Sequence, residues 1–443
     1  MRLILVLAAL LARPAHGGLS DGVLLTVDRA YLERSRALIA AGDSRVMAAY
    51  KELLRQADGL VANLTESGAF SVMNKTGVAP SGDKHDYISL SEYYWPCTCT
   101  SSGPLDPPHC PASSGDDAHK PPPPTPCDNA TGLPYVRHDG WLDPRIADYD
   151  MDDLASMFSF STTLAYAYFF SGNESYGAAG ARVLKAWFVS SDTKMAPNMQ
   201  YAQVVPGLYP DGQHSGTIDG SCHLPYVYDA LTLISPSPAW SAGDNASVTS
   251  WVTSYTKWLA NSAAGRNESA LEHNNHATWY IVGVSSGSLW TGDVATAAHF
   301  LSRAPASVIG QQVALNGSLP YELARTRSFF YSDFDSHAMM LVGRMTDLAG
   351  LPPLWTYTSP GNGTSLRSVV DFFVPYAALV PRLPWPFPQV DPPGTAPYTS
   401  ASLFDIYLRA AVIWSNSTYR AWAYALDGDH STDLATLLWA QTL

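Results

Sequence analysis

The chain has 443 residues and a formal net charge of -13, from 26 Lys and Arg against 39 Asp and Glu. Hydrophobic residues make up 46% of it, which excludes intrinsic disorder because enough apolar area is present to offset the entropy of the chain. The acidic balance also argues against a nucleic-acid-binding protein, which needs a basic surface facing the phosphates.

The N-terminus has the pattern of a secretion signal. Arg2 is followed by an apolar run over residues 3–12 and then by small residues up to Gly17. A run of about ten apolar residues is too short to cross a bilayer, which takes about twenty. We therefore expect residues 1–18 to be a signal peptide, and residues 19–443 to form one secreted domain that is not attached to a membrane.

Helical periodicity dominates the rest of the chain, and strand-like alternation is scarce. Successive helices joined by short turns predict an all-α domain of helical hairpins stacked around a common centre. The helices are expected at 27–40, 44–63, 150–170, 176–188, 223–233, 246–263, 271–287, 292–303, 334–349, 365–379, 400–415, 419–426 and 432–440.

Residues 80–143 break this pattern, because Gly, Pro, Cys and Ser are frequent there. We expect a long loop, with a Cys/Pro-rich insertion at about 97–131 that disulfides tie down. Zinc is a poorer explanation, since no Cys-x-x-Cys spacing occurs. Frequent Asn-X-Ser/Thr acceptors also suit a glycosylated, secreted protein. The cysteines are Cys97, Cys99, Cys110, Cys127 and Cys222, and the acceptors are Asn63, Asn74, Asn129, Asn173, Asn245, Asn267, Asn316, Asn362 and Asn416.

A first polar cluster stands where an apolar helix is expected to begin. It contains Glu272, Asn274, Asn275 and His276, followed by Trp279. Such residues can serve chemistry, or they can simply satisfy the free backbone donors of a helix start. A metal site is disfavoured, because zinc-binding helices place their histidines four residues apart with a Glu between them.

A second cluster places Arg325 and Arg327 just before an aromatic run that ends at Tyr331. Paired guanidinium groups beside a tyrosine suit recognition of a carboxylate, which Arg can bind through two hydrogen bonds. The alternative is a surface helix on which the arginines pair with Glu322 or Asp333.

Two further segments combine aromatic and short polar side chains. Sugars suit such surfaces, since their rings stack on aromatic faces while their hydroxyls form hydrogen bonds. The alternative is core packing, which explains most Trp and Tyr residues in most proteins. The candidates are Lys84, His85, Tyr87 and Trp95 in the first segment and Gln203 in the second.

Together these motifs resemble those of the alginate-lyase-type polysaccharide lyases, in the family's order and over most of the chain from about Val27 to Pro375. The resemblance implies an incomplete (α/α) toroid with the Cys/Pro-rich loop as an insertion. The motifs that carry it are residues 84–87, 94–96, 132–135, 139–140, 186–188, 198–207, 274–280 and 322–331.

The resemblance also implies a secreted enzyme that cleaves a 4-O-linked uronate polysaccharide, alginate or glucuronan, by β-elimination. The product would carry a 4,5-unsaturated uronate end. The implied substrate is an anionic polysaccharide, no cofactor is needed, and we expect a monomer. The implied catalytic residues are Asn275, His276, Arg325 and Tyr331, and the implied substrate-binding residues are Lys84, His85, Tyr87, Trp95, Gln203, Asn274, Trp279 and Arg327.

In this scheme Asn275 and an arginine neutralise the substrate carboxylate, while His276 and Tyr331 act as base and acid. Which of the two takes the proton depends on whether elimination is syn or anti, and the sequence leaves that open.

Two rival functions stay open. A glycoside hydrolase on the same helical toroid needs a pair of carboxylates, for which Asp86, Asp139 and Glu272 are available. A catalytically impaired secreted glycan-binding protein would keep the cleft without the reaction. The second rival rests on residues 281–283, where Ile, Val and Gly replace the Asp and Gln that the resemblance leads one to expect.

Overall fold

The computed structural model describes residues 22–64, 71–97, 132–212, 215–271, 273–379, 381–389 and 400–440. The predicted signal peptide, nearly all of the Cys/Pro-rich insertion, and Glu272 lie outside these ranges. Cleavage of the signal, the pairing of the loop cysteines and the single-domain organisation therefore stay predictions. Cys222, which lies within the described ranges, is a free thiol.

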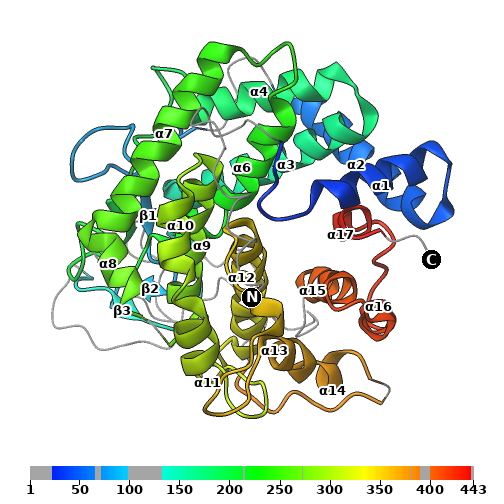
Figure 1. Ribbon diagram of the computed structural model, residues 1–443. Coiled ribbons are helices and arrows are strands. Elements are labelled where there is room, and N and C mark those ends of the chain that lie inside the picture. Colours follow the sequence, from blue (N-terminus) through cyan, green and yellow to red (C-terminus); the bar gives the residue numbers. More distant parts are fainter. Residues whose placement is uncertain are drawn as a thin grey trace, which may run out of the picture.

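The described chain is mostly helical, which confirms the predicted fold class (Figure 1). The longer helices are α1 (Arg29–Ala40), α2 (Ser44–Asn63), α3 (Met151–Ser171), α4 (Glu174–Phe188), α6 (Leu224–Ile234), α7 (Ala242–Asn261), α9 (Asn275–Trp290), α10 (Val294–Leu301), α12 (Ser328–Leu348) and α15 (Ser400–Ile413). The shorter ones are α5 (Ile218–Ser221), α8 (Ala263–Ser269), α11 (Pro320–Leu323), α13 (Leu366–Phe372), α14 (Val374–Ala377), α16 (Ser417–Ala423) and α17 (Leu434–Leu438).

The turn between α3 and α4 shows why these hairpins form where the sequence predicts them. Gly172 adopts φ 69°, a left-handed conformation that favours glycine, and it ends α3. The next residue, Asn173, accepts the backbone N–H of Ser175 and so caps α4. A tight reversal follows, and the two helices pack against each other.

The helices form a ring in which α2, α3, α6, α9, α12 and α15 contact one another in that order (Figure 1). The short helix α17 contacts α15 on one side and α1 and α2 on the other, so it joins the last hairpin to the first. Among the described residues, the single short helix α17 occupies this position of the ring in place of a hairpin. The architecture is therefore an incomplete (α/α) toroid, as predicted.

Two small sheets lie at one end of the toroid. Strand β1 (Ile88–Leu90) runs parallel to β4 (Tyr201–Val204), with Ile88 opposite Tyr201 and Leu90 opposite Val204. Strand β2 (Tyr94–Trp95) runs antiparallel to β3 (Val136–Arg137). These pairings bring loops that are distant in sequence to the end of the toroid where α9 and α12 begin.

Several predicted helix boundaries were wrong, among them the start of α7, which is Ala242 and not residue 246. Helix α9 begins at Asn275 rather than at residue 271, because Asn274 adopts an extended conformation and caps it. Helix α12 begins at Ser328, six residues before the predicted start. The helix expected over residues 365–379 is divided into α13 and α14, because Pro375 cannot donate a backbone hydrogen bond and its ring clashes with the preceding turn. Within the described ranges, no helix has both the length and the apolar character that a bilayer crossing needs.

Candidate active site

A cavity of about 880 Å³ opens at the end of the toroid that carries the two sheets. It is lined by the first turns of α9 and α12, by α11, by β2 and by parts of α3, α5 and α8. Six of the predicted site residues line it together: Gln203, Asn274, Asn275, His276, Arg325 and Tyr331. The two polar clusters, about fifty residues apart in sequence, therefore face one another across one cavity.

His276 lies in the first turn of α9, where the side chain of Asn274 accepts its backbone N–H at 3.0 Å. Its ring nitrogen Nδ1 is 2.5 Å from Oε1 of Glu268, a fully buried carboxyl group of α8. Burial lowers the pKa of His276, but the charge and hydrogen bond of Glu268 outweigh that effect, so the pKa is raised. Protonated histidine is thus favoured more than in water.

Asn275 is buried beside Glu322 of α11. Oε1 of Glu322 accepts both the backbone N–H of Asn275, at 2.6 Å, and its side-chain amide, at 2.9 Å. This double contact fixes the amide plane and leaves one amide N–H of Asn275 for a ligand. Burial raises the pKa of Glu322, although the hydrogen bonds from Asn275 oppose the rise.

Arg325 is clamped by Asp139. Its Nε and Nη2 donate to the two carboxylate oxygens at 2.6–3.2 Å, and Arg137 donates to the same carboxylate at 2.7 Å. Burial raises the pKa of Asp139, but the hydrogen bonds and charge of Arg325 more than offset this and hold the pKa below its usual range. The clamp turns Arg325 towards the cavity, and neither Glu322 nor Asp333 is its ion-pair partner.

A glycine makes this clamp possible. Gly140 adopts φ 85°, and a Cβ atom added to it would lie 2.6 Å from Oγ1 of Thr326. The same hydroxyl of Thr326 donates to Asp139 at 2.9 Å. A side chain at position 140 would therefore push the carboxylate away from Arg325.

Tyr331 lies in the first turn of α12, with the guanidinium carbon of Arg325 3.6 Å from the centre of its ring. Its hydroxyl donates to the hydroxyl of Tyr93 at 2.7 Å. Burial raises the pKa of Tyr331 well above its ordinary value, and the cation on the ring face only partly opposes this. The phenol is therefore protonated at neutral pH.

Gln203 is held in an unusual conformation on β4. Its φ is 52°, in the left-handed region that few residues other than glycine adopt. Its side-chain amide donates to Asp219 at 2.7 Å, and its backbone N–H donates to Ser89 at 2.7 Å. Asp219 also accepts from Ser89 and Tyr87, so a buried network keeps Gln203 at the cavity wall.

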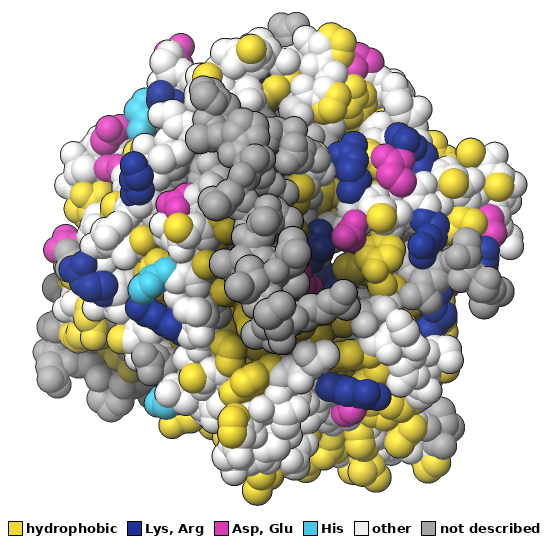
Figure 2. Space-filling view, in the orientation of Figure 1, with side chains coloured by type: hydrophobic (Ala, Val, Ile, Leu, Met, Phe, Trp, Pro, Cys, Tyr) yellow, Lys and Arg dark blue, Asp and Glu magenta, His cyan; other side chains and the backbone are white. Residues whose placement is uncertain are grey.

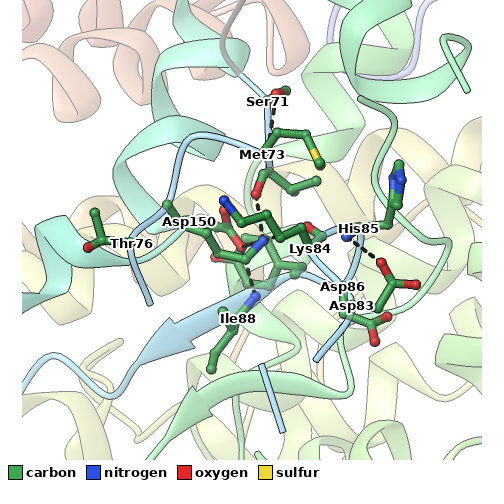
Figure 3. Close-up of polar contacts among 12 residues, drawn as sticks. Ser71, Met73, Thr76, Asp83, Lys84, His85, Asp86, Ile88 and Asp150 are labelled. Atoms are coloured by element: carbon green, nitrogen blue, oxygen red, sulfur yellow. Dashed lines mark hydrogen bonds and ion pairs between the residues drawn. The ribbon is translucent and has the colours of Figure 1, made fainter. Parts of the chain in front are cut away.

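Lys84 and His85 lie on the loop before β1 (Figure 3). Neither residue lines the cavity. The backbone carbonyl of Lys84 accepts from the buried Lys75, which forms an ion pair with Asp150 at 3.0 Å. Nδ1 of His85 contacts the carbonyl of Lys194 at 2.6 Å. Both residues therefore make contacts that stabilise this loop. Their role in binding substrate stays a prediction.

The predicted aromatic residues are buried and do not line the cavity, so their contact with substrate stays a prediction. Trp95 and Tyr87 have no exposed surface, and Trp279 packs against Phe334 in the core. Tyr87 instead supports Asp219 from behind. Arg327 does not line the cavity, because its guanidinium group packs over the ring of Phe330, 4.8 Å from its centre.

The carboxylates considered for hydrolysis are poorly suited to it. Asp139 is bound by two arginines, and Asp86 accepts from Ser81 on the exposed loop. Glu272 lies outside the described residues. Other carboxyl groups do line the cavity, namely Glu92, Asp219 and Glu322. In the described part of the chain, no three His, Cys, Asp or Glu side chains are grouped as a metal ion would require.

The surface charge shows no dominant basic patch on the face drawn in Figure 2. Lys and Arg side chains are scattered there among Asp and Glu. Distant charges are screened within about 8–10 Å in physiological salt, so the groups nearest to an anionic ligand in the cavity act on it most strongly.

Supporting residues that were not predicted as part of the lyase site include Glu268, Glu322 and Tyr93. Each acts on a predicted residue through a contact that no local spacing reveals. Glu268 precedes His276 by eight residues across a helix break, and Tyr93 is 238 residues from Tyr331. The sequence offered only a weak indication of these residues. Charged residues make up only 15% of the chain, so a Glu close to a polar cluster is uncommon and could have been noted as a candidate.

The chain is similar to known proteins that bear on this site. A family model for alginate lyase matches residues 71–382. Among solved structures, an alginate lyase from Bacteroides ovatus matches with a TM-score of 0.80 and 27% identity, covering 95% of this chain and 99% of that one. Alginate lyase A1-III from Sphingomonas species A1 matches with a TM-score of 0.40 and 13% identity, covering 73% and 76%. No curated protein matches the sequence.

Proposed function

The chain belongs to the alginate lyase family of polysaccharide lyases, and from that premise we propose that it cleaves a 4-O-linked uronate polysaccharide, alginate or glucuronan, by β-elimination. The observation that carries the proposal is the convergence of Asn275, His276, Arg325 and Tyr331 on one cavity. Secretion of the enzyme, which rests on the predicted signal at residues 1–18, is part of the proposal.

The reaction has two proton transfers. A base removes the proton from C5 of the uronate, and the C–H electron pair becomes the C4–C5 double bond. The C4–O4 bond then breaks, and the departing oxygen takes a proton from an acid. Removal from C5 requires that the adjacent carboxylate be neutralised, because negative charge develops there.

Two groups suit the neutralising role. Arg325 uses Nε and Nη2 on Asp139, which leaves the donors of Nη1 for a substrate carboxylate. The second amide proton of Asn275 is available as well, since Glu322 holds only one. Both donors are fixed before substrate arrives, so little reorganisation accompanies the reaction.

The environments of the other two residues favour one assignment of acid and base. Tyr331 is protonated at neutral pH, because burial raises its pKa, and it can therefore supply the proton that O4 needs. His276 has the carboxylate of Glu268 behind its Nδ1, which leaves the other ring nitrogen to act as a general base. We assign His276 as the base and Tyr331 as the acid.

The test is to incubate the purified protein with alginate and with glucuronan and to follow ultraviolet absorbance. A lyase produces an absorbing C4–C5 double bond conjugated to the carboxylate, a hydrolase produces only reducing ends, and a binding protein produces neither. We expect the absorbing product with at least one of the two polymers.

Two variants test the assigned residues. His276→Ala and Tyr331→Phe each remove one proton-transfer group, so we expect each to lower kcat by at least about 100-fold. Tyr209→Phe changes a hydroxyl on the same cavity wall that has no role in proton transfer, and it should keep most of the activity. Full activity of both His276→Ala and Tyr331→Phe would show that the assignment is wrong.

A further inference from the structure

Glu268 lies behind His276 and has no exposed surface. Each of its carboxylate oxygens has a partner: Oε1 is 2.5 Å from Nδ1 of His276, and Oε2 accepts the backbone N–H of Thr217 at 3.2 Å. Thr217 directly precedes α5, so the carboxylate is held between two elements that both border the cavity. Glu268 itself does not line it.

This contact occupies one of the two ring nitrogens of His276. Burial raises the pKa of Glu268, while the charge and hydrogen bond of His276 oppose the rise. When ionised, the carboxylate only accepts hydrogen bonds, so Nδ1 carries the hydrogen in that state. The nitrogen that remains is Nε2, and the side chain keeps 18% of its surface exposed, on the wall of the cavity. Nε2 is therefore the ring nitrogen that can exchange a proton with a ligand.

The charged groups around the ring come from three directions. Glu268 of α8 and Glu322 of α11 favour a positive imidazole, while Arg325, which follows α11, opposes it. Glu322 is partly engaged by Asn275, whereas Glu268 accepts a direct, short hydrogen bond from Nδ1 of His276. Of the three groups, Glu268 therefore interacts most strongly with the imidazole ring.

We propose that Glu268 is a positioning residue for His276, which fixes the ring proton on Nδ1, directs Nε2 into the cavity and makes Nε2 a stronger base. The inference rests on the proposed function in that it serves the proton-accepting role of His276. Glu268 touches no substrate and acts only through the ring.

The first test measures the ring itself by nitrogen NMR on protein labelled with ¹⁵N-histidine. The chain has 12 histidines, and the signal of His276 is identified by its loss in His276→Gln. In the neutral ring we expect the hydrogen on Nδ1. In Glu268→Gln, which keeps an acceptor but removes the charge, the titration midpoint of His276 should fall by about one pH unit.

A matched pair elsewhere in the chain provides the control. Nδ1 of His430 is 2.7 Å from Asp433, away from the cavity. Asp433→Asn should shift the signal of His430 and leave that of His276 unchanged. Two results would overturn the proposal. One is a neutral His276 ring in the wild type that carries its hydrogen on Nε2, and the other is an unchanged titration midpoint of His276 in Glu268→Gln.

The second test follows turnover. In Glu268→Gln we expect kcat to fall about 10–100-fold with KM nearly unchanged, and the acid limb of the kcat/KM profile to move to lower pH with the ring. Glu268→Asp keeps the charge, so its limb should stay near that of the wild type. If Glu268→Gln does not fold, the position of the ring hydrogen in wild-type His276, measured by NMR, decides the proposal. An acid limb at the same pH in both variants, displaced in neither, would refute the proposal. Absence of unsaturated product from the wild type would instead refute the proposed function. The NMR test of the His276 ring does not depend on turnover, so its result would still hold.

Discussion

Asp139 is the residue on which the cationic side of the cavity depends. One carboxylate binds Arg325 and Arg137, and it also accepts the backbone N–H and hydroxyl of Thr326. Removing it would leave two arginines free to turn towards solvent or towards each other. The position of Arg325 over Tyr331 is therefore set by a group from another part of the chain.

We expect Asp139→Asn to lower kcat/KM roughly 10–100-fold, because an amide cannot balance two guanidinium charges or accept at both of its terminal atoms. The measurement is the rate of formation of the unsaturated product. Asp43→Asn removes a similar two-point contact with Arg45 at the start of α2, outside the cavity, and should leave the rate unchanged. Equal rates for Asp139→Asn and the wild type would mean that Arg325 needs no clamp.

The site was predictable where its residues are close in sequence. Asn275 next to His276, and Arg325 six residues before Tyr331, form polar clusters that stand out from an apolar background. The residues that hold them, such as Glu268 and Asp139, act across helix breaks or across much of the chain, and no spacing rule covers such contacts. The aromatic candidates Tyr87 and Trp95 are buried, and their burial could not be predicted, since an aromatic residue in a core and one in a sugar site have the same local sequence.

At the scale of elements, the start of α12 is capped by a segment sixty residues further along the chain. Arg327, at the N-cap position, makes no side-chain cap. Instead the backbone N–H of Ser328 donates to the carbonyl of Pro388, and that of Phe329 donates to Oε1 of Gln389 at 3.0 Å. Trp385 donates to the hydroxyl of Ser328 at 2.8 Å. The helix turn that carries Tyr331 is thus held from outside.

Gln389→Ala should therefore cost about 1 kcal/mol of folding free energy, as loss of a helix cap does, and also lower kcat several-fold by loosening the turn of Tyr331. Asp293→Ala removes the cap of α10, which accepts the backbone N–H of Thr296. It should cost a similar amount of stability, measured by urea unfolding, without changing kcat. The same kcat loss in both variants would indicate a general effect of stability on activity.

The cap that Pro388 and Gln389 form also explains why the predicted start of α12 was wrong. Residues 328–333 offer no capping side chain before them, so the sequence gives no local signal for a helix start there. The partner groups lie near residue 388 and become neighbours only in the folded chain. Helices α2 and α4, which have their own caps, were located to within two residues, but the starts of α7 and α9, which are also capped locally, were misplaced by four.

At the scale of the whole molecule, several carboxyl groups are buried in the toroid. Burial raises the pKa of Asp333 to about 7, although Ser402 donates to it, and Asp405 of α15 adds to the rise. Burial likewise raises the pKa of Asp150 to about 7 and that of Asp229 to about 6. Each of these groups binds its proton more tightly in the folded protein than in the unfolded chain.

The sign of the pH dependence follows. For an acid whose folded pKa is raised, stability falls as pH rises from about 4, the ordinary value for Asp, to about 7, and then levels off. Asp333→Asn should flatten this decline by up to about 4 kcal/mol and raise Tm at pH 7.5. Thermal unfolding between pH 4 and 8 measures it, with the exposed Asp192→Asn as the control. A decline as steep in Asp333→Asn as in the wild type would contradict the assignment.

The contact between α1 and α17 bears on how much of the chain must be expressed to give an active protein. The hydroxyl of Ser35 donates to the carbonyl of Leu437, and Tyr31 packs against Trp439. The region matched by the family model, residues 71–382, contains none of these residues, nor the segment that caps α12. A fragment trimmed to that match would expose the apolar faces of α3 and α12 that α2 and α15 now cover, so its expected fate on expression is aggregation rather than catalysis.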